Sequence, residues 1–132
     1  MSRKSAREAA FKTIFEVPFH ANETPVDIIN YSADYCEGLK THNDTEYYKE
    51  VTTKCFENIN EIDNKISNAL QGWTMNRISK INLAILRLAI CEISYIQDIP
   101  YQVSINEAIE LAKQYGDDDS PVFINGILAS LI

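Results

Sequence analysis

Apolar residues recur at helical spacing along most of the chain. Between residues 6 and 15 they follow one another three or four positions apart, which is the period of an amphipathic helix. A second helix is predicted to start at Thr24-Pro25-Val26-Asp27. Threonine is a good N-cap, proline suits the first helical position, and aspartate complements the positive end of the helix. We expect this helix to run to about Leu39.

The next helix start is predicted at Asn43, because Asn43 and Glu46 have the spacing of a capping box. A long polar and apolar stretch follows to about Leu70, with a break expected near residues 58–60. Gly72 is a candidate C-terminal cap, since glycine is the residue that most often ends a helix.

The segment from Arg77 to Ile96 has almost no polar face. A helix that is apolar on all sides is buried in the middle of a bundle, and this run is too long for a typical strand. Ile99-Pro100 ends it. Ser104-Ile105-Asn106-Glu107 then has the S-x-x-E pattern of a capping box and predicts another helix start. By the same logic the last helix begins at Ser120-Pro121.

These segments predict an all-α protein, a compact bundle of about seven helices. A length of 132 residues suits a single domain over 1–132. The longest apolar run, Leu83 to Cys91, is broken by Arg87 and is far shorter than the roughly 18 residues of a membrane span. The first residues have no apolar stretch of the signal-peptide type. We therefore expect a soluble, cytoplasmic protein, with Cys36, Cys55 and Cys91 as buried, reduced thiols.

Motifs of catalysis and metal binding are scarce. The two histidines have no metal-ligand spacing, and there is no G-x-S-x-G or phosphate-binding loop. Asp117-Asp118-Asp119 is the densest group of carboxylates. It either binds a divalent cation or, as we favour, places negative charge before the positive end of the last helix. We predict that the protein is not an enzyme and holds no metal or cofactor.

Charge is distributed unevenly along the chain. The net charge is -7, yet residues 1–12 carry four basic residues against one acidic residue, a net +3. The other eight basic and 18 acidic residues give the remainder a net charge of -10. An acidic surface repels nucleic acid, but a local basic cluster overrides this within a Debye length of about 8 Å. The amino-terminal end is therefore a candidate nucleic-acid contact.

Three features have a structural and a functional interpretation. Arg87 lies in the middle of the most apolar helix, so it either pairs with a buried carboxylate or emerges at a functional surface. Phe123, just after the acidic group, is either a core residue or an exposed platform for stacking. Arg3, Lys4 and Arg7 form a basic cluster, and basic residues near an aromatic ring are the usual means of binding single-stranded RNA.

Three stretches carry a resemblance to a known family. Residues 77–113 include RISKINLAILRLA and DIPYQVSINEAIELAK, and residues 115–128 read YGDDDSPVFINGIL. The opening SRKSAREAA at residues 2–10 is similar to an arginine-rich family opening, whereas residues 17–60 carry little signal. Together these stretches resemble the NusB family of bacterial transcription antitermination factors, and the length fits a complete member.

The resemblance implies a fold and a function. The fold is all-helical, with two roughly perpendicular three-helix units. Members bind the boxA element of ribosomal RNA leader transcripts, and they do so with NusE, which is also a small-subunit ribosomal protein. The pair joins NusA, NusG and RNA polymerase so that transcription reads through terminators.

The resemblance also implies site residues. The positions that match the family's RNA surface are Arg3, Lys4, Arg7, Arg87, Asp119 and Phe123. Those that match the side facing NusE are Phe15, Asn76 and Asn82.

The chain departs from the family pattern by carrying fewer charges. Many members have a basic residue at the positions of Leu83, Gln102 and Val122, a further arginine at Ser5, and an acidic residue at Asn82. With about three or four phosphate contacts on a single strand, the salt slope of binding would be roughly -2 to -3. We expect weak RNA binding by the chain alone and a marked dependence on the partner.

Two alternatives stay open. Beside the adaptor, one alternative is a homodimeric interaction module whose RNA surface is masked. The other is a stand-alone relative of the RNA-binding domain of ribosomal RNA methyltransferases. Apolar residues at Leu83 and Val122 suit the first alternative. The second requires a nucleotide-binding domain, which these 132 residues do not include.

Overall fold

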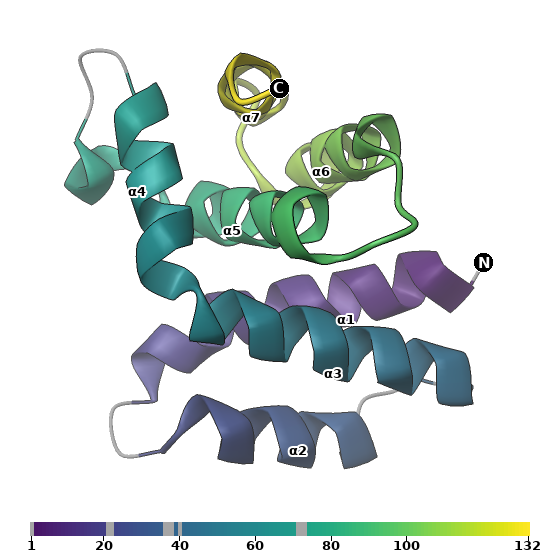
Figure 1. Ribbon diagram of the computed structural model, residues 1–132. Coiled ribbons are helices and arrows are strands. Elements are labelled where there is room, and N and C mark those ends of the chain that lie inside the picture. Colours follow the sequence, from purple (N-terminus) through teal and green to yellow (C-terminus); the bar gives the residue numbers. More distant parts are fainter. Residues whose placement is uncertain (1, 21–22, 36–38, 40, 71–73) are drawn as a thin grey trace.

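The computed structural model describes residues 2–20, 23–35, 39, 41–70 and 74–132, without the side chains of Ser2, Arg3, Asp34 and Tyr35. Within these ranges the chain forms seven α-helices and two short 3₁₀ helices, η1 and η2, and no strand (Figure 1). In chain order they are α1 (Ser2–Glu16), η1 (Val17–Phe19), α2 (Pro25–Tyr35), α3 (His42–Glu57), α4 (Ile59–Ala69), η2 (Met75–Arg77), α5 (Lys80–Tyr95), α6 (Tyr101–Tyr115) and α7 (Ser120–Ser130). The predicted all-α bundle of about seven helices is confirmed.

The helices form two groups that cross each other. In Figure 1, α1, α2 and α3 lie side by side across the lower half of the molecule, while above them α7 is seen nearly end-on and α6 obliquely. In the first group α3 packs against both α1 and α2; in the second, α5, α6 and α7 pack against one another. Helix α4 connects the groups, since it follows α3 and packs against α5 and α7. This arrangement agrees with the two crossed three-helix units that the resemblance implied.

Helix α5 is the centre of the core. It packs against α1, α3, α4, α6 and α7, so it has almost no face left for solvent. Nine of its residues are buried, and Glu92 is the charged one among them. Burying one leucine or isoleucine side chain contributes about 1.5–3 kcal/mol, so this helix supplies much of the stability of the bundle. The interpretation of residues 77–96 as a buried helix is confirmed.

Two of the predicted helix starts agree with the structure. Helix α2 begins at Pro25, and the Thr24 hydroxyl accepts a hydrogen bond from the Asp27 backbone N–H at 3.2 Å. Helix α7 begins at Ser120, as predicted. The break between the third and fourth helices is at Asn58, also inside the predicted range.

Two other predicted starts are wrong. Helix α3 begins at His42, and its N-cap is Thr41, whose hydroxyl accepts from the Asp44 N–H at 3.1 Å. Helix α6 begins at Tyr101, so Ser104 lies inside the helix and caps nothing. Ser104 is buried, and its hydroxyl donates to the Glu92 carboxylate at 2.8 Å. A capping-box pattern is local, whereas this serine is used in a tertiary contact.

Two cysteines are buried and free, as predicted: Cys55 and Cys91. The Cys91 thiol donates to the Val51 carbonyl at 3.3 Å, and a hydrogen bond with Cys55, together with burial, raises the pKa of Cys91. Cys36, Gly38 and Gly72 lie outside the described residues. The second helix is described as far as Tyr35, and Leu39, the next described residue, is not helical.

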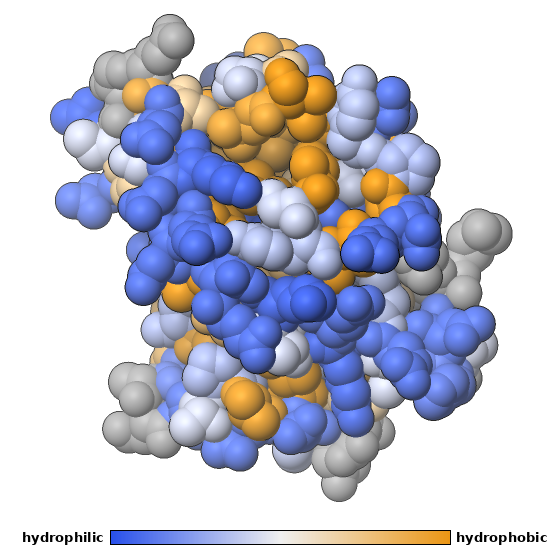
Figure 2. Space-filling view, viewed as in Figure 1, coloured by the Kyte–Doolittle hydropathy of each residue, from blue (hydrophilic) through white to orange (hydrophobic). Residues whose placement is uncertain are grey.

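The surface is mostly polar on the face shown in Figure 2, with apolar atoms gathered in its upper part, over α7 and beside α4. Leu131 and Ile132, which follow α7, are both exposed, with 36% and 55% of their surface accessible. Among the described residues, no helix combines the length and the apolar character needed to cross a membrane.

Candidate nucleic-acid and partner interface

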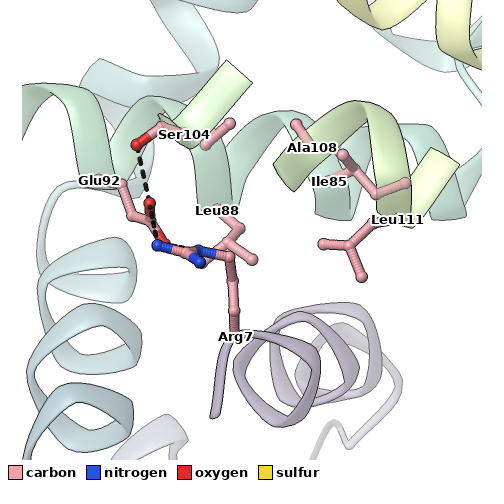
Figure 3. Close-up of a pocket in the computed structure, with 8 residues that line it drawn as sticks. Arg7, Ile85, Leu88, Glu92, Ser104, Ala108 and Leu111 are labelled. Atoms are coloured by element: carbon pink, nitrogen blue, oxygen red, sulfur yellow. Dashed lines mark hydrogen bonds and ion pairs between the residues drawn. The ribbon is translucent and has the colours of Figure 1, made fainter. Parts of the chain in front are cut away.

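The amino-terminal end of α1 carries the expected basic cluster, and the structure separates its members. Lys4 has 62% of its side chain exposed, and its Nζ lies 4.0 Å from Oε1 of Glu107 on α6. The side chain of Arg3 lies outside the described part of the chain. Arg7 is one turn further along α1 and points into the molecule, toward α5 and α6 (Figure 3). Lys4 is thus the cluster member whose described side chain faces solvent.

Arg7 is held in a buried ion pair, and only 5% of it is exposed. Its Nε donates to Oε2 of Glu92 at 2.6 Å, and its Nη2 donates to Oε1 at 3.2 Å (Figure 3). The Tyr47 hydroxyl on α3 donates to the same Oε2, and Ser104 on α6 donates to Oε1. Four helices therefore meet at one carboxylate.

This network bears on the expected RNA contact at Arg7, which stays a prediction. A buried charge is tolerated when it is paired and hydrogen-bonded, and Glu92 supplies both conditions. Burial by itself lowers the pKa of Arg7, but the hydrogen bond and the negative charge of Glu92 outweigh burial, so that the pKa is raised. Arg7 thus remains a cation, and its charge is paired with that of Glu92 inside the protein.

A hollow of about 500 Å³ lies between the amino-terminal ends of α5 and α7. We call it the α5–α7 hollow. It is lined by Arg77, Ile78, Ser79, Asn82, Asp117, Asp119, Ser120, Val122 and Phe123. It brings together two residues that the resemblance assigned to RNA, Asp119 and Phe123, and one that it assigned to the partner, Asn82.

Phe123 has both of the environments that the sequence left open. Its ring is half-buried against the core, and it also lines the α5–α7 hollow. The acidic residues before it are exposed, and the side chain of Asp119 makes no capping hydrogen bond. Instead, the Ser120 hydroxyl accepts from the Asp117 N–H at 2.9 Å and shapes the turn into α7. Asp119 is therefore placed at the hollow with its carboxylate toward solvent.

Asn82 lies in the first turn of α5, where the Ser79 hydroxyl accepts a hydrogen bond from its N–H at 3.0 Å. Its side-chain oxygen, Oδ1, is buried and has no hydrogen-bond partner within the described part of the chain. Asn76, in η2, is exposed. Both asparagines thus lie close to the start of α5, and the Asn82 Oδ1 atom is buried without a partner among the described residues.

Phe15 and Arg87 lie together at a second hollow, of about 300 Å³, between the end of α1 and α5. The rings of Phe15 and Phe19 are 5.4 Å apart, and 60% of Phe19 is exposed. Arg87 makes a bidentate pair with Asp63 of α4, with both N–O distances at 2.9 Å. Only 15% of the Arg87 side chain is exposed.

The two alternatives for Arg87 are resolved by this pair. Its charge is matched by a carboxylate, as one alternative proposed, although Asp63 is only partly buried, with 28% of its side chain exposed. Arg87 also shares a hollow with Phe15 and not with Asp119 or Phe123. The expected RNA contact at Arg87 stays a prediction, and Arg87 lines a different hollow from Asp119 and Phe123.

Sequence reasoning missed Glu92, Tyr47, Ser104 and Glu107. The sequence contained one signal for Glu92. This residue directly follows a nine-residue apolar run in which Arg87 is the only charged residue. An acidic residue on a helix without a polar face needs a buried partner. The identity of that partner had no signal, because Arg7 is 85 positions away in the chain.

Comparison with known proteins gives a consistent result. The model of the NusB family matches residues 4–132. The transcription antitermination protein NusB of Alkaliphilus oremlandii is 46% identical over 132 residues, which cover 100% of this chain and 94% of that protein.

Solved structures agree with this result. NusB of T. maritima superposes with a TM-score of 0.88 at 35% identity, covering 98% of this chain and 89% of that chain. A chain from a crystal structure of antitermination factors NusB and NusE in complex with dsRNA has a TM-score of 0.86 at 24% identity. It covers 98% of this chain and 95% of that one, and at this identity the likeness concerns the fold. From the family match and these relatives, the chain belongs to the NusB family.

Proposed function

We propose that this protein is an RNA-binding adaptor in transcription antitermination. With NusE it binds the boxA element of ribosomal RNA leader transcripts, and the pair joins NusA, NusG and RNA polymerase. The observation that carries the proposal is the similarity, over the whole chain, to a transcription antitermination protein at 46% identity. A protein of the same fold is found with NusE and double-stranded RNA, which supports both partner classes.

The geometry supports two neighbouring contact surfaces. The candidate RNA contacts are exposed Lys4 at the amino-terminal end of α1 and, in a different hollow, Asp119 and Phe123 between α5 and α7. The partner surface centres on Phe15 and the hollow between α1 and α5. Asn82 lies between them, because it lines the α5–α7 hollow on the same helix, α5, that borders the hollow at Phe15.

The charges of the described residues support weak RNA binding by the chain alone. Arg7 and Arg87 are matched by Glu92 and Asp63, so two of the expected cations are withdrawn from phosphate. One or two contacts with a single strand remain, and each contributes about 0.7 to the salt slope, which gives roughly -0.7 to -1.4. This slope is shallower than the value expected from the sequence.

Fluorescence anisotropy of a labelled boxA RNA tests the proposal. The RNA is titrated at two salt concentrations with and without NusE, beside a scrambled strand and a duplex of the boxA sequence. Selective binding that NusE strengthens is the expected result. Equal affinity with and without NusE contradicts the dependence on the partner. Absence of binding in every condition contradicts the RNA adaptor and redirects the search to protein partners, including a second copy of this chain.

A matched pair of variants locates the RNA surface. Val122→Lys places a cation at the rim of the α5–α7 hollow, where 79% of Val122 is exposed. We expect tighter RNA binding and a salt slope steeper by about 0.7, one added phosphate contact. Val26→Lys makes the same substitution on α2, where 58% of the residue is exposed. The two variants have the same net charge, so an equal gain from both would show that the hollow is not the RNA surface.

A further inference from the structure

Glu107 of α6 faces the one cation of the basic cluster whose described side chain is exposed. Its Oε1 lies 4.0 Å from Lys4 Nζ and 3.6 Å from Arg7 Nη1, and 25% of its side chain is exposed. The sequence suggested a capping-box role for Glu107, but α6 begins three residues before Ser104, and no family match assigns this carboxylate a role. It is therefore a charged group beside the proposed RNA surface without an explanation.

Arg7 holds the Glu107 carboxylate in position. The Arg7 guanidinium is held in place, because it makes two hydrogen bonds with Glu92 inside the core. The charge of Arg7 is also already balanced by Glu92. Contact with Arg7 therefore anchors the Glu107 carboxylate without neutralising it, and its negative charge acts on Lys4.

The surroundings of Lys4 are more acidic than the sequence indicates. Lys4 lines a hollow of about 480 Å³ with Arg7, Asp98, Pro100, Val103 and Glu107, and the charge of Arg7 is paired with Glu92. Two carboxylates thus border the space that a phosphate would enter to reach Lys4. A phosphate at this point would meet repulsion from Glu107 and would also have to replace the Lys4–Glu107 attraction.

We propose that Glu107 sets the RNA affinity of the amino-terminal end of α1 by competing with phosphate for Lys4. The inference rests on the proposed function and adds an affinity-determining residue to it. Removal of the Glu107 charge should strengthen binding to all RNA sequences alike, because phosphate contacts carry no sequence information.

The size of the effect follows from the exposure of the pair. Exposed charge pairs contribute about 0.2–1 kcal/mol, so we expect a gain in affinity of roughly 1.5- to 5-fold in low salt. Debye screening shortens from about 10 Å at 0.1 M salt to about 3 Å at 1 M, so the gain should shrink as salt rises. The variant should therefore have a steeper salt slope than the parent protein.

The test is Glu107→Gln in the full chain, measured by RNA anisotropy across a salt series. Glutamine keeps the shape of the side chain and an acceptor for Arg7, and thermal melting of each variant checks that the fold is retained. The matched control is Glu57→Gln, which removes the same charge from an exposed site. Glu57 is the last residue of α3, at the end of the bundle opposite the amino terminus (Figure 1).

The mechanism is checked with Lys4→Ala and the double variant Lys4→Ala/Glu107→Gln. We expect tighter binding with Glu107→Gln than with Glu57→Gln, and a smaller gain when Lys4 is absent. An equal effect of the two glutamine variants overturns the inference, and so does weaker binding with Glu107→Gln. An undiminished gain without Lys4 also overturns it. These results leave the proposed function intact, whereas failure of every variant and the parent protein to bind RNA removes both.

Discussion

At the scale of single residues, Arg7 and Arg87 are basic side chains whose charges are paired with carboxylates. Both are cations that the family resemblance placed at an RNA surface, and both are matched by carboxylates in the folded protein. The difference between them is burial: Arg7 is 6% exposed at its side chain and Arg87 is 15% exposed. In the folded protein these pairs connect helices, α1 to α5 and α4 to α5, and the expected RNA contacts of both arginines stay predictions.

The Glu92 network makes a sharp prediction for stability. Glu92→Gln removes the negative charge and leaves the buried Arg7 cation without its counter-ion, so we expect the free energy of unfolding to fall by about 3 kcal/mol or more. Chemical denaturation followed by circular dichroism measures it. Glu61→Gln is the matched control, because Glu61 also accepts from a tyrosine hydroxyl, that of Tyr95, but at an exposed site. A similar small loss in both variants would contradict the importance of the buried pair.

Phe123 should affect both stability and RNA binding, because its ring is half-buried and lines the α5–α7 hollow. Phe123→Ala should lower the free energy of unfolding by about 1–3 kcal/mol, less than the loss for a fully buried ring. It should also weaken RNA binding by about 1–3 kcal/mol if a base stacks on the ring. Denaturation and anisotropy on the same preparation separate the two effects. Unchanged RNA affinity would make Phe123 a core residue alone.

At the scale of elements, serine and threonine hydroxyls that cap their own helix differ from one that contacts another helix. Thr24, Thr41 and Ser79 each accept a hydrogen bond from a backbone N–H three residues ahead. Ser104 has a similar sequence setting, yet its hydroxyl is directed across the helix interface to Glu92. A capping pattern therefore predicts a helix start only where no tertiary partner competes for the hydroxyl.

The Ser79 cap should be measurable by itself. Ser79→Ala removes the acceptor for the Asn82 N–H at the start of α5, and the loss should be about 1 kcal/mol of unfolding free energy. Ser67→Ala, at an exposed site in α4, serves as control and should change the unfolding free energy by less than about 0.5 kcal/mol. Because Asn82 lines the α5–α7 hollow, a loss of order at this cap should also lower the effect of NusE on RNA binding. Equal stability of the two variants would show that the cap does not contribute.

At the scale of the whole molecule, the two crossed helix groups share one core. Helix α5 packs against α1 and α3 of the first group and against α6 and α7 of the second. Through Tyr47, Arg7 and Ser104, the Glu92 carboxylate connects α3, α1 and α6 as well. The groups therefore lack the separate cores that independent domains would need.

A single cooperative unfolding transition is the expected consequence. Helix content, followed by far-ultraviolet circular dichroism, and the environment of the tyrosines, followed in the near ultraviolet, should give the same midpoint in urea. Tyr48 of the first group is fully buried, so the near-ultraviolet signal reports its packing. Two separate midpoints would show that α1–α3 and α5–α7 unfold independently.

Much of the fold could be predicted from residue patterns. The apolar run before Glu92 indicated a central buried helix, and Thr24-Pro25 and Ser120-Pro121 marked the starts of α2 and α7. The candidate site was harder. Asp119, Phe123 and Asn82 were selected from the resemblance, but nothing in the sequence indicated that they line one hollow. Glu107 had no signal, because its position next to Lys4 depends on how α6 packs beside α1.

The sequence by itself determined the number, order and type of the helices, because apolar periodicity and the capping chemistry of Thr24 and Ser120-Pro121 act over a few neighbouring residues. It also determined the family to which the chain belongs. Only the tertiary structure decided which charges face solvent. Arg7 and Glu92 are 85 positions apart, and the pairing of a buried charge depends on which helices pack together. The same packing leaves Lys4 exposed and places Glu107 beside it.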